Sequence, residues 1–419
     1  MSDTIYVYGD FCSETPSLMG YLYIDISRGV EHVSFEFDRT WLLNHKSNFI
    51  LDPDLHPVQG RQYPTGKSTF GLFADASPDR WGRVLMERRE RFAADREARK
   101  PKKLGSSDYL LGVYDVTRMG GIRLKKEPTG AFLSDDRENA VPPWSTLRTL
   151  EEASRNFEDE KMTLQEKWLK QLIRPGSSLG GARPKATVQD IDGALWIAKF
   201  PSRKDDGNVG AWEKTAHDLA KQCGLRTPDS RLETFSKLGS TFLTKRFDRM
   251  GPKRIHFASA MTMLGRTDGA SADDGASYLH IASFLKANGT APKEDLVELW
   301  KRILFNMAIT NSDDHLRNHG FLLGQNGWRL SPLYDVNPVP YGDTLALNID
   351  ADDNTISLEL AIDTAPYYGL TKELAQSMAL EMLDTIRQNW QRLARKNGLT
   401  HAAMEQMRPA FTLCYETPG

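Results

Sequence analysis

The pattern of apolar and polar positions changes in character along this chain of 419 residues. In the first part, short runs of β-branched and aromatic residues partly alternate with polar positions, and Gly, Ser or Asp separates one run from the next. These runs are TIYVYGD, LMGYLYID and HVSFEFD. Alternation of this kind predicts strands that place one face against a core.

Two helical patterns follow these strands. The first is SPDRWGRVLMERRERFAADREARK, with Ser77 as a candidate N-cap and Pro78 at the first helical position. The second is TLRTLEEASRNFEDE. Basic residues gather at the end of the first pattern, at Arg88, Arg89, Arg91, Arg96, Arg99, Lys100, Lys102 and Lys103. Acidic residues interrupt them, which favours a solvated helix face over a patch that binds nucleic acid or a protein partner.

From about residue 170 the pattern changes. IRPGSSLGGARPKATVQDIDGALWIAKFPS predicts a Gly/Ser-rich loop, a strand around 185–188, a turn at DIDG and a second strand. AWEKTAHDLAKQCGL then predicts a helix that Gly224 ends, and LGSTFLTKRFD predicts a further hairpin. Beyond about residue 256 helical patterns dominate, including EDLVELWKRILFNMAIT and ELAQSMALEMLDTIRQNWQRLARKNG. A β-rich part followed by a helical part predicts an α+β fold with two lobes around a cleft.

Composition narrows the class of protein. The net charge of -2 argues against nucleic-acid binding through overall charge. Only Cys12, Cys223 and Cys414 are present, without a C-x-x-C pair, which argues against a disulfide framework or structural zinc site and suits a reducing cytoplasm. The N-terminal residues lack a signal-peptide pattern, and no apolar run approaches the roughly 18 residues of a membrane span. We therefore expect a soluble cytoplasmic protein without a membrane segment.

The stretch NSDDHLRNHGFLL, residues 311–323, places dense polar groups directly after an apolar helical pattern. Within it Asp313 and Asn318 form D-x-x-x-x-N, the spacing of the protein-kinase catalytic loop. In that loop the aspartate orients an attacking hydroxyl or removes its proton, and the asparagine oxygen holds Mg²⁺. The spacing alone is weak evidence, because such intervals often arise by chance.

The residues that follow strengthen this interpretation. GFLL, GQNG and WRLSPLYD predict a short hairpin that returns Asp335 to the side of Asn318. Mg²⁺ typically takes one or two carboxylates, so Asp335 is a candidate metal ligand. The alternative for Asp335 alone is a turn aspartate before Asn337 and Pro338.

ATP binding needs further groups. Lys199 ends the strand LWIAKF, where it could contact the α- and β-phosphates, and Glu213 on the next helix could pair with it. Considered singly, Lys199 fits a strand-end surface lysine and Glu213 a solvated glutamate near a helix N-terminus. Upstream, backbone N–H groups could approach phosphates in a glycine loop, for which a plain turn is the alternative. The residues of this loop are Ser177, Ser178, Gly180 and Gly181.

The order of these elements is stronger evidence than any one of them, because it is the order in protein kinases. The segments SSLGGARPKA, IAKFP, KRFDR, NSDDHLRNHGFLL and LSPLYDVNP resemble the signature segments of the HipA family. FADASPDRWGR and DYLLGVYDVTRMGGIRL resemble its N-terminal part, so the resemblance covers most of the chain. Members of this family are serine/threonine kinases that act as toxins of bacterial toxin–antitoxin pairs.

The resemblance implies a two-lobed protein-kinase-like fold in three parts. These are a HipA-like N-terminal subdomain at 1–155, the nucleotide-binding part of the N-lobe at 156–255, and a helical C-lobe with the catalytic loop at 256–419. The resemblance further implies a small helix-turn-helix antitoxin as partner, with DNA reached through that antitoxin. The implied target lies in translation, such as an aminoacyl-tRNA synthetase.

The resemblance also assigns roles by position. They are Asp313 as catalytic aspartate, Asn318 and Asp335 as Mg²⁺ ligands, and Lys199 and Glu213, with the glycine loop, as ATP-binding residues. Ser178 falls where family members autophosphorylate, and a phosphate there would compete with ATP for the loop amides. Ser177 is an adjacent alternative. The loop departs from the family at Arg183 and Pro184, where a glutamine is common before the lysine region.

Three alternatives stay open. A pseudokinase or antitoxin-binding module would keep the fold without turnover, although the intact catalytic positions argue against it. A small-molecule kinase would use the same groups on a sugar or lipid hydroxyl. A metal nuclease would use Asp313, Asp314, His315 and Asp335, and would leave the lysine strand and the glycine loop unexplained.

Overall fold

The computed structural model describes residues 2–45, 50–133, 141–159, 172, 181 and 183–416. The chain folds into two compact units. Unit 1 comprises Met1–Arg203, Lys245–Ala258 and Leu322–Asn326, and unit 2 comprises Lys204–Thr244, Ser259–Phe321 and Gly327–Gly419. The chain therefore passes between the units several times, which no local sequence pattern predicts.

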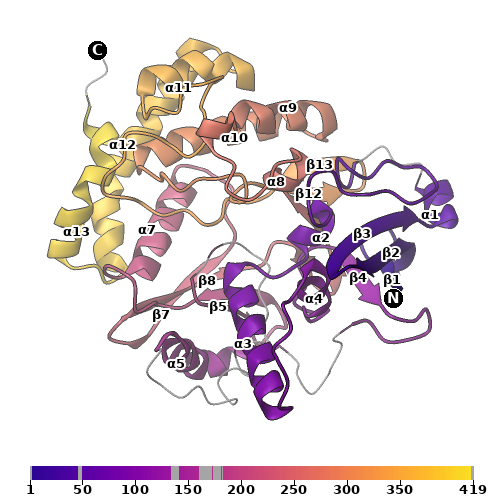
Figure 1. Cartoon of the computed structure of the whole chain (residues 1–419). Coiled ribbons are helices and arrows are strands. Elements are labelled where there is room, and N and C mark those ends of the chain that lie inside the picture. The colour runs from indigo at the N-terminus through magenta and orange to yellow at the C-terminus, as the bar shows by residue number, and fades with distance from the viewer. Residues whose placement is uncertain are drawn as a thin grey trace. The chain divides into compact units, whose positions relative to one another are not determined.

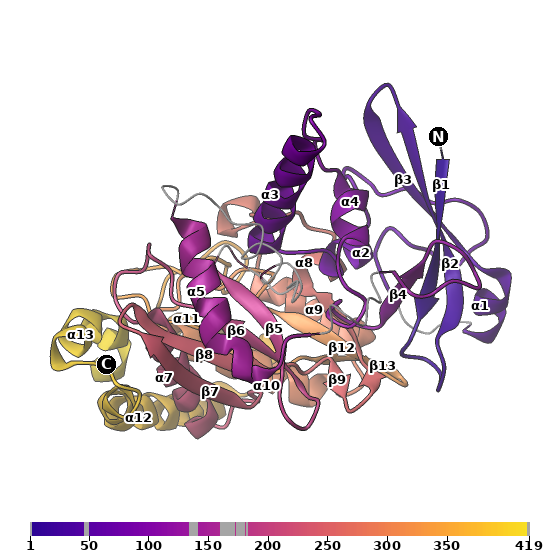
Figure 2. The same cartoon turned by 90° about the horizontal axis from the view of Figure 1, so that it is seen from below.

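Unit 1 opens with a four-stranded antiparallel sheet (Figure 1, Figure 2). Its strands are β1 (Ser2–Gly9), β2 (Ser17–Ser27), β3 (Val30–Phe37) and β4 (Ile122–Lys125), in the order β3-β2-β1-β4. In β2, Leu22 and Ile24 are buried, whereas the residues before each of them, Tyr21 and Tyr23, are half-buried. This alternation confirms the predicted strands, since every second side chain faces the core.

Helices follow the first three strands of unit 1. They are α1 (Arg39–Asn44), α2 (Gly71–Asp75), α3 (Arg80–Arg96), α4 (Ser106–Leu111) and α5 (Leu147–Glu158). The helices α3 and α5 pack together through Trp81 and Phe157, whose rings meet edge to face with centroids 5.1 Å apart. Arg88 adds to this contact by donating to the Phe157 carbonyl at 2.9 Å.

The N-terminus of α3 differs from the sequence prediction. Asp79 caps the helix, because its carboxylate accepts the Gly82 N–H at 2.8 Å. The predicted cap, Ser77, is wrong, since its hydroxyl donates to the Phe73 carbonyl at 2.7 Å and belongs to the preceding turn. An aspartate two residues beyond the serine competes successfully, as both residue types are good caps.

The basic segment at the end of α3 is partly neutralised. Arg99 forms an ion pair with Glu90, and Lys102 forms one with Asp108 at 2.7 Å. The residues around them are exposed. These features agree with the solvated helix face that the interrupted charge pattern indicates.

A hairpin ends the continuous first segment of unit 1. β5 (Lys185–Gln189) and β6 (Leu195–Lys199) pair with Lys185 opposite Lys199. Asp190 shapes the turn, because its carboxylate accepts the N–H groups of Asp192 and Ala194 at 3.0 and 2.8 Å. The hairpin predicted at DIDG is confirmed, and every residue of β6 is buried.

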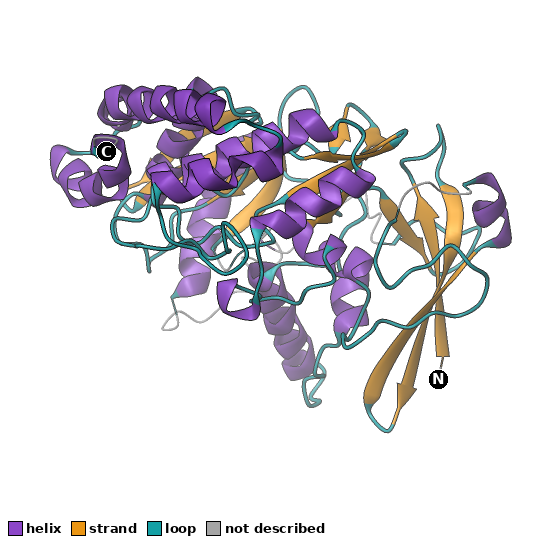
Figure 3. Ribbon diagram, turned by 90° about the horizontal axis from the view of Figure 1, so that it is seen from above, coloured by secondary structure: helices purple, strands orange, loops and turns teal. Residues whose placement is uncertain are grey.

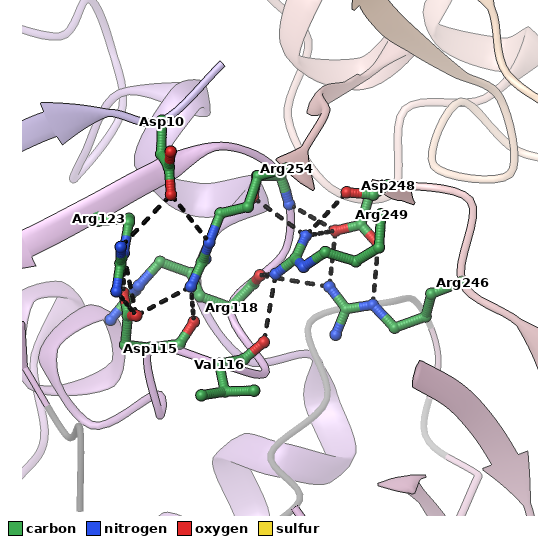
Figure 4. Close-up of polar contacts among 10 residues, drawn as sticks. Asp10, Asp115, Val116, Arg118, Arg123, Arg246, Asp248, Arg249 and Arg254 are labelled. Carbon is green, nitrogen blue, oxygen red and sulfur yellow. Dashed lines mark hydrogen bonds and ion pairs between the residues drawn. The ribbon is translucent and has the colours of Figure 1, made fainter. Parts of the chain in front are cut away.

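A buried network of charges holds the segment Lys245–Ala258 within unit 1 (Figure 4). Its charged members are Asp10, Asp115, Arg123, Arg246, Asp248, Arg249 and Arg254. Asp248 accepts hydrogen bonds from Arg246, Arg249 and the Gly120 N–H at 2.6 to 2.9 Å. Backbone carbonyls accept further hydrogen bonds from the guanidinium groups. The Thr117 carbonyl accepts from Arg246 and the Arg118 carbonyl from Arg249, which offsets the excess of arginines over aspartates. Two short strands, β9 (Arg249–Met250) and β10 (Lys253–Arg254), pair within this segment.

Helices dominate unit 2 (Figure 3). They are α7 (Val209–Gln222), α8 (Ala260–Met263), α9 (Tyr278–Asn288), α10 (Pro292–Ala308), α11 (Leu358–Thr364), α12 (Lys372–Lys396) and α13 (His401–Met407), with a 3₁₀ helix at Arg408–Tyr415. β7 (Ser230–Ser236) and β8 (Gly239–Lys245) form a hairpin, of which the predicted segment LGSTFLTKRFD supplies only the second strand, since its partner strand lies earlier in the chain. As predicted, α7 ends just before Gly224, whose φ of +72° suits glycine. The two long apolar patterns form α10 and α12, with Trp300 and Trp390 buried between neighbouring helices.

The α+β fold is confirmed, since the N-terminal region combines sheets with helices and the C-terminal region is mainly helical. The three predicted parts, 1–155, 156–255 and 256–419, stay a prediction. None of the helices in the described part of the chain is both long and apolar enough to cross a membrane.

Candidate active site

The loop with the candidate catalytic residues begins where α10 ends. Thr310 has a φ of +50°, a left-handed conformation that a β-branched residue rarely adopts. Its hydroxyl donates to the Ala410 carbonyl at 2.9 Å, and the Cys414 thiol donates to the Ala308 carbonyl at 3.4 Å. Contacts with the 3₁₀ helix Arg408–Tyr415 therefore hold a strained turn at the start of the loop.

Asp314 anchors this loop through one carboxylate oxygen. Its Oδ2 accepts hydrogen bonds from Tyr278 at 2.6 Å, Asn306 at 2.7 Å and His319 at 2.8 Å. Burial alone would raise the pKa of Asp314, but the His319 ring and the other donors hold it below its usual range. Three donors on one buried oxygen are best satisfied by a carboxylate, so Asp314 holds the loop in place from within the core.

Asp313 and Asn318 are tied together across the D-x-x-x-x-N spacing. Asn318 Nδ2 donates to the Asp313 carbonyl at 3.0 Å, and the Asn318 N–H donates to the His315 carbonyl at 2.8 Å. Asn318 is 4% exposed, and its Oδ1 has no hydrogen-bond partner among the described residues. A buried amide oxygen without a donor is costly unless a ligand completes it, so this oxygen fits a hard cation such as Mg²⁺.

The predicted hairpin after this loop is present. It consists of β12 (Gly320–Gly324) and β13 (Gly327–Leu330), and the Ser331 N–H closes it by donating to the Gly320 carbonyl at 2.8 Å. Beyond it the Tyr334 hydroxyl donates to the Arg317 carbonyl at 2.7 Å, which fixes the next residue, Asp335, beside the loop. Asp335 has a φ of +57°, a conformation that aspartate tolerates better than most residues.

The carboxylates of Asp313 and Asp335 interact. Although Asp313 is exposed, partial desolvation by its neighbours raises the pKa of its carboxyl, and the charges of Asp335 and Asp314 raise it further, while His315 lowers it. No group of three or more His, Cys, Asp or Glu side chains that could hold a metal occurs within the described ranges. A cation here would therefore depend on the Asn318 amide oxygen together with one or two carboxylates, a donor set that Mg²⁺ accepts.

Lys199 and Glu213 are both buried. Lys199 ends β6 and is 8% exposed, and Glu213 lies on α7 and is 3% exposed. The alternatives given above, a surface lysine at 199 and a solvated glutamate at 213, are therefore wrong. Gly210 brings the start of α7 close to β8, since a Cβ there would stand 2.0 Å from the Ser240 carbonyl oxygen. Lys199 belongs to unit 1 and Glu213 to unit 2, and their pairing stays a prediction.

Most of the glycine loop, namely Ser177, Ser178 and Gly180, lies outside the described residues. Gly181 has a φ of +91°, which glycine adopts without strain. A Cβ at Gly181 would lie 3.4 Å from Lys185 Nζ, and that nitrogen forms an ion pair with Asp79 at 2.9 Å. The sequence marks Lys185 only as the start of a strand. Its burial beside Gly181 depends on a partner from a distant part of the chain.

Sequence reasoning also missed the polar groups that contact Asp314 from other elements. Tyr278 and Asn306 contact Asp314 from α9 and α10. One signal could have identified Asn306, because it is a polar residue inside the apolar run ILFNMAI. A buried asparagine needs hydrogen-bond partners, so its position in such a run indicates a polar contact in the core.

One protein-family model matches this chain. It describes a HipA-like C-terminal domain and matches residues 177–390, just over half of the chain. This span contains Lys199, Asp313, Asn318 and Asp335.

Two curated relatives are similar to part of the chain. A kinase candidate from Sinorhizobium fredii, Y4dM, is 28% identical over 230 residues, which cover 50% of this chain and 54% of the relative. The serine/threonine-protein kinase toxin HipA of Shewanella oneidensis is 25% identical over 290 residues, which cover 59% of this chain and 65% of the relative. The chain thus spans between about half and two thirds of the length of these relatives.

A solved structure is similar over nearly the whole chain. It is the complex of HipA, HipB and operator DNA from the toxin–antitoxin system of Shewanella oneidensis MR-1. The match covers 98% of this chain and 95% of that chain, with 19% identity and a TM-score of 0.67. This similarity confirms the prediction that this chain has the protein-kinase-like fold found in HipA.

Proposed function

We propose that this chain, which belongs to the family of the HipA-like C-terminal domain, is a kinase. It transfers a phosphoryl group from ATP to a protein serine or threonine. One observation carries the proposal. The buried side-chain oxygen of Asn318 has no hydrogen-bond donor among the described residues and lies on the same loop as Asp313. The charge of Asp335 raises the pKa of Asp313. A hydroxyl-orienting carboxylate beside oxygen ligands suits phosphoryl transfer.

Each side chain has a separate role in this proposal. Asp313 accepts a hydrogen bond from the substrate hydroxyl and takes its proton as the oxygen attacks phosphorus. The raised pKa of Asp313 makes its ionised form a better base than an ordinary carboxylate. Lys199 binds the α- and β-phosphates, and Glu213 holds the lysine. Asn318 and Asp335 would hold Mg²⁺, which supplies positive charge to the phosphate oxygens when bound.

The proposal includes autophosphorylation of the glycine loop. Ser178 occupies the position that family members phosphorylate, and Ser177 is the neighbouring alternative. A phosphate on either serine would compete with ATP phosphates for the same backbone N–H groups. Autophosphorylation would therefore switch the kinase off.

The proposed partner is a helix-turn-helix antitoxin through which the chain reaches DNA. The similar solved complex, which contains HipB and operator DNA beside HipA, supports this part of the proposal. The proposed target is a protein of translation, such as an aminoacyl-tRNA synthetase, and the proposed location is the cytoplasm. The target follows from the family resemblance, and the location from the small number of cysteines.

A small-molecule kinase is the second candidate function, since the same groups would phosphorylate a sugar or lipid hydroxyl. The nuclease alternative loses support, because Asp314, one of its intended ligands, is buried and occupied by three donors. A pseudokinase would keep these residues without turnover.

The test is incubation of the purified chain with γ-labelled ATP and Mg²⁺, followed by phosphosite mapping. We expect phosphate on Ser178 or Ser177 in the wild type and none in Asp313→Asn. Phosphorylation by the Asp313→Asn variant, or a wild type that binds no nucleotide, would refute the assignment. Nuclease activity that survives Lys199→Ala would favour the metal-nuclease alternative.

A further inference from the structure

A continuous chain of hydrogen bonds runs from Asp314 to the segment that contains Asp335. Asn306 Nδ2 donates to Asp314 Oδ2 at 2.7 Å, and Asn311 Nδ2 donates to Asn306 Oδ1 at 3.1 Å. Asn311 Oδ1 then accepts the Asn337 N–H at the longer distance of 3.5 Å. Asn306 and Asn311 are almost fully buried, so water does not compete for these contacts.

The two ends of the chain fix its direction. A carboxylate oxygen accepts and a backbone N–H donates, so each asparagine must turn its nitrogen toward Asp314 and its oxygen toward Asn337. Reversing either amide would place two donors or two acceptors against each other. The chain therefore has one hydrogen-bonded arrangement rather than several of similar energy.

Members of the chain of hydrogen bonds, or their direct partners, lie next to or two residues from Asp313, Asn318 and Asp335. Asp314 follows Asp313, His319 follows Asn318, and Asn337 lies two residues after Asp335. His319 is included because its Nε2 contacts Asp314 Oδ2 at 2.8 Å. The contacts of Asp314 therefore fix the backbone next to Asp313 and next to Asn318. Through Asn306 and Asn311 they also reach the segment that contains Asp335.

We propose that Asp314 is the positioning residue of this site. It sets the candidate catalytic aspartate and both candidate metal ligands relative to one another, without touching substrate or metal itself. This inference rests on the proposed kinase function and extends it to the groups under the loop. A purely structural role would change stability alone, whereas a positioning role changes turnover more than ATP binding.

The test uses two buried tyrosines of unit 2. Tyr278→Phe removes a hydroxyl that donates to Asp314, whereas Tyr368→Phe removes a hydroxyl with no hydrogen-bond partner in the described part of the chain. Both side chains are fully buried, so each change deletes the same atom in a similar environment. We expect Tyr278→Phe to lower kcat about tenfold, with KM for ATP changed less than about twofold, because a charge-assisted hydrogen bond is lost. Tyr368→Phe should keep the wild-type kcat.

Amide hydrogen exchange supplies a readout that does not need turnover. We expect faster exchange at residues 313–319 in Tyr278→Phe, and at residues 335–337 in Asn311→Ala, than in the wild type and Tyr368→Phe. Unchanged exchange and kcat in Tyr278→Phe would overturn the inference, and so would an equal kcat loss in Tyr368→Phe. A wild type without phosphoryl transfer would instead refute the proposed function. The exchange rates would then decide the positioning role by themselves.

Discussion

Asn318 donates its side-chain N–H to the Asp313 carbonyl at 3.0 Å and leaves its own Oδ1 without a donor within the described ranges. One amide thus joins the two ends of the loop and offers an oxygen ligand at the same time. An aspartate at this position could bind a cation but could not donate to the carbonyl. The physical requirement for asparagine therefore comes from both halves of its amide.

The Asn318 amide leads to the first prediction. Asn318→Ala should lower kcat at least about a hundredfold, because it removes an oxygen ligand that helps to stabilise charge in the transition state. Its melting temperature should fall only modestly, since Oδ1 makes no internal hydrogen bond to the described residues and only the Nδ2 bond to the Asp313 carbonyl, worth about 1 kcal/mol, is lost. Asn318→Asp should retain Mg²⁺ binding but lose part of kcat, since the loop tie is broken. Mg²⁺ titrations of kcat measure both effects, and wild-type values in Asn318→Ala would contradict the assignment.

The Asp313 carboxylate should cost stability while it serves function. Partial desolvation and the nearby Asp335 raise the pKa of this exposed carboxyl in the folded protein above that of the unfolded chain, so the effect on stability is small. The folded state therefore binds the proton more tightly, and stability falls as pH rises through this range. Asp313→Asn should melt higher than the wild type at neutral pH in EDTA, and this advantage should vanish below about pH 4, where the unfolded carboxyl is protonated. A lower melting temperature for the variant at neutral pH would show that the ionised Asp313 carboxylate does not destabilise the folded protein.

Local patterns in the sequence predict much of this molecule, and long-range contacts account for what they miss. Asp190 explains the turn of the β5–β6 hairpin from within four residues, so a local pattern suffices. The role of Asp314 depends instead on Tyr278, 36 residues earlier at the start of α9, and no spacing rule links the two. The burial of Lys185 depends in the same way on Asp79. The roles assigned to Lys199 and Glu213 rest on order and resemblance, and their burial agrees with partners that the sequence alone does not identify.

The buried network around Asp248 predicts a pH-dependent loss of stability. Although burial alone would raise it, the charges of Arg246 and Arg249 hold the pKa of Asp248 well below its usual range. Its contribution is thus present above the unfolded carboxyl pKa of about 4 and is lost as pH falls toward the folded value. Asp248→Asn should lower the free energy of unfolding of unit 1 by about 3 to 5 kcal/mol at neutral pH, since buried arginines lose their counter-charge.

Urea denaturation of Asp248→Asn at several pH values provides the measurement. The difference from the wild type should shrink in acid. Asp10→Asn is the matched control, because Asp10 belongs to the same network but is more exposed and lies 3.4 and 3.6 Å from its arginine partners. It should cost much less than Asp248→Asn. Equal losses for the two variants, or a difference independent of pH, would contradict this account.

The buried pair of Lys185 and Asp79 allows a double-mutant test. Both side chains are 1% exposed, and the pair connects the start of β5 to the N-cap of α3. Asp79→Asn keeps a capping residue but removes the Asp79 carboxylate from beside the buried lysine charge, which should lower the free energy of unfolding by about 3 kcal/mol. Adding Lys185→Met removes that charge and should recover a large part of the loss, because an apolar replacement of a buried ion pair is often tolerated. Chemical denaturation of the wild type, the two single variants and the double variant gives the coupling energy, and additive losses would show that the pair is not the source of the effect.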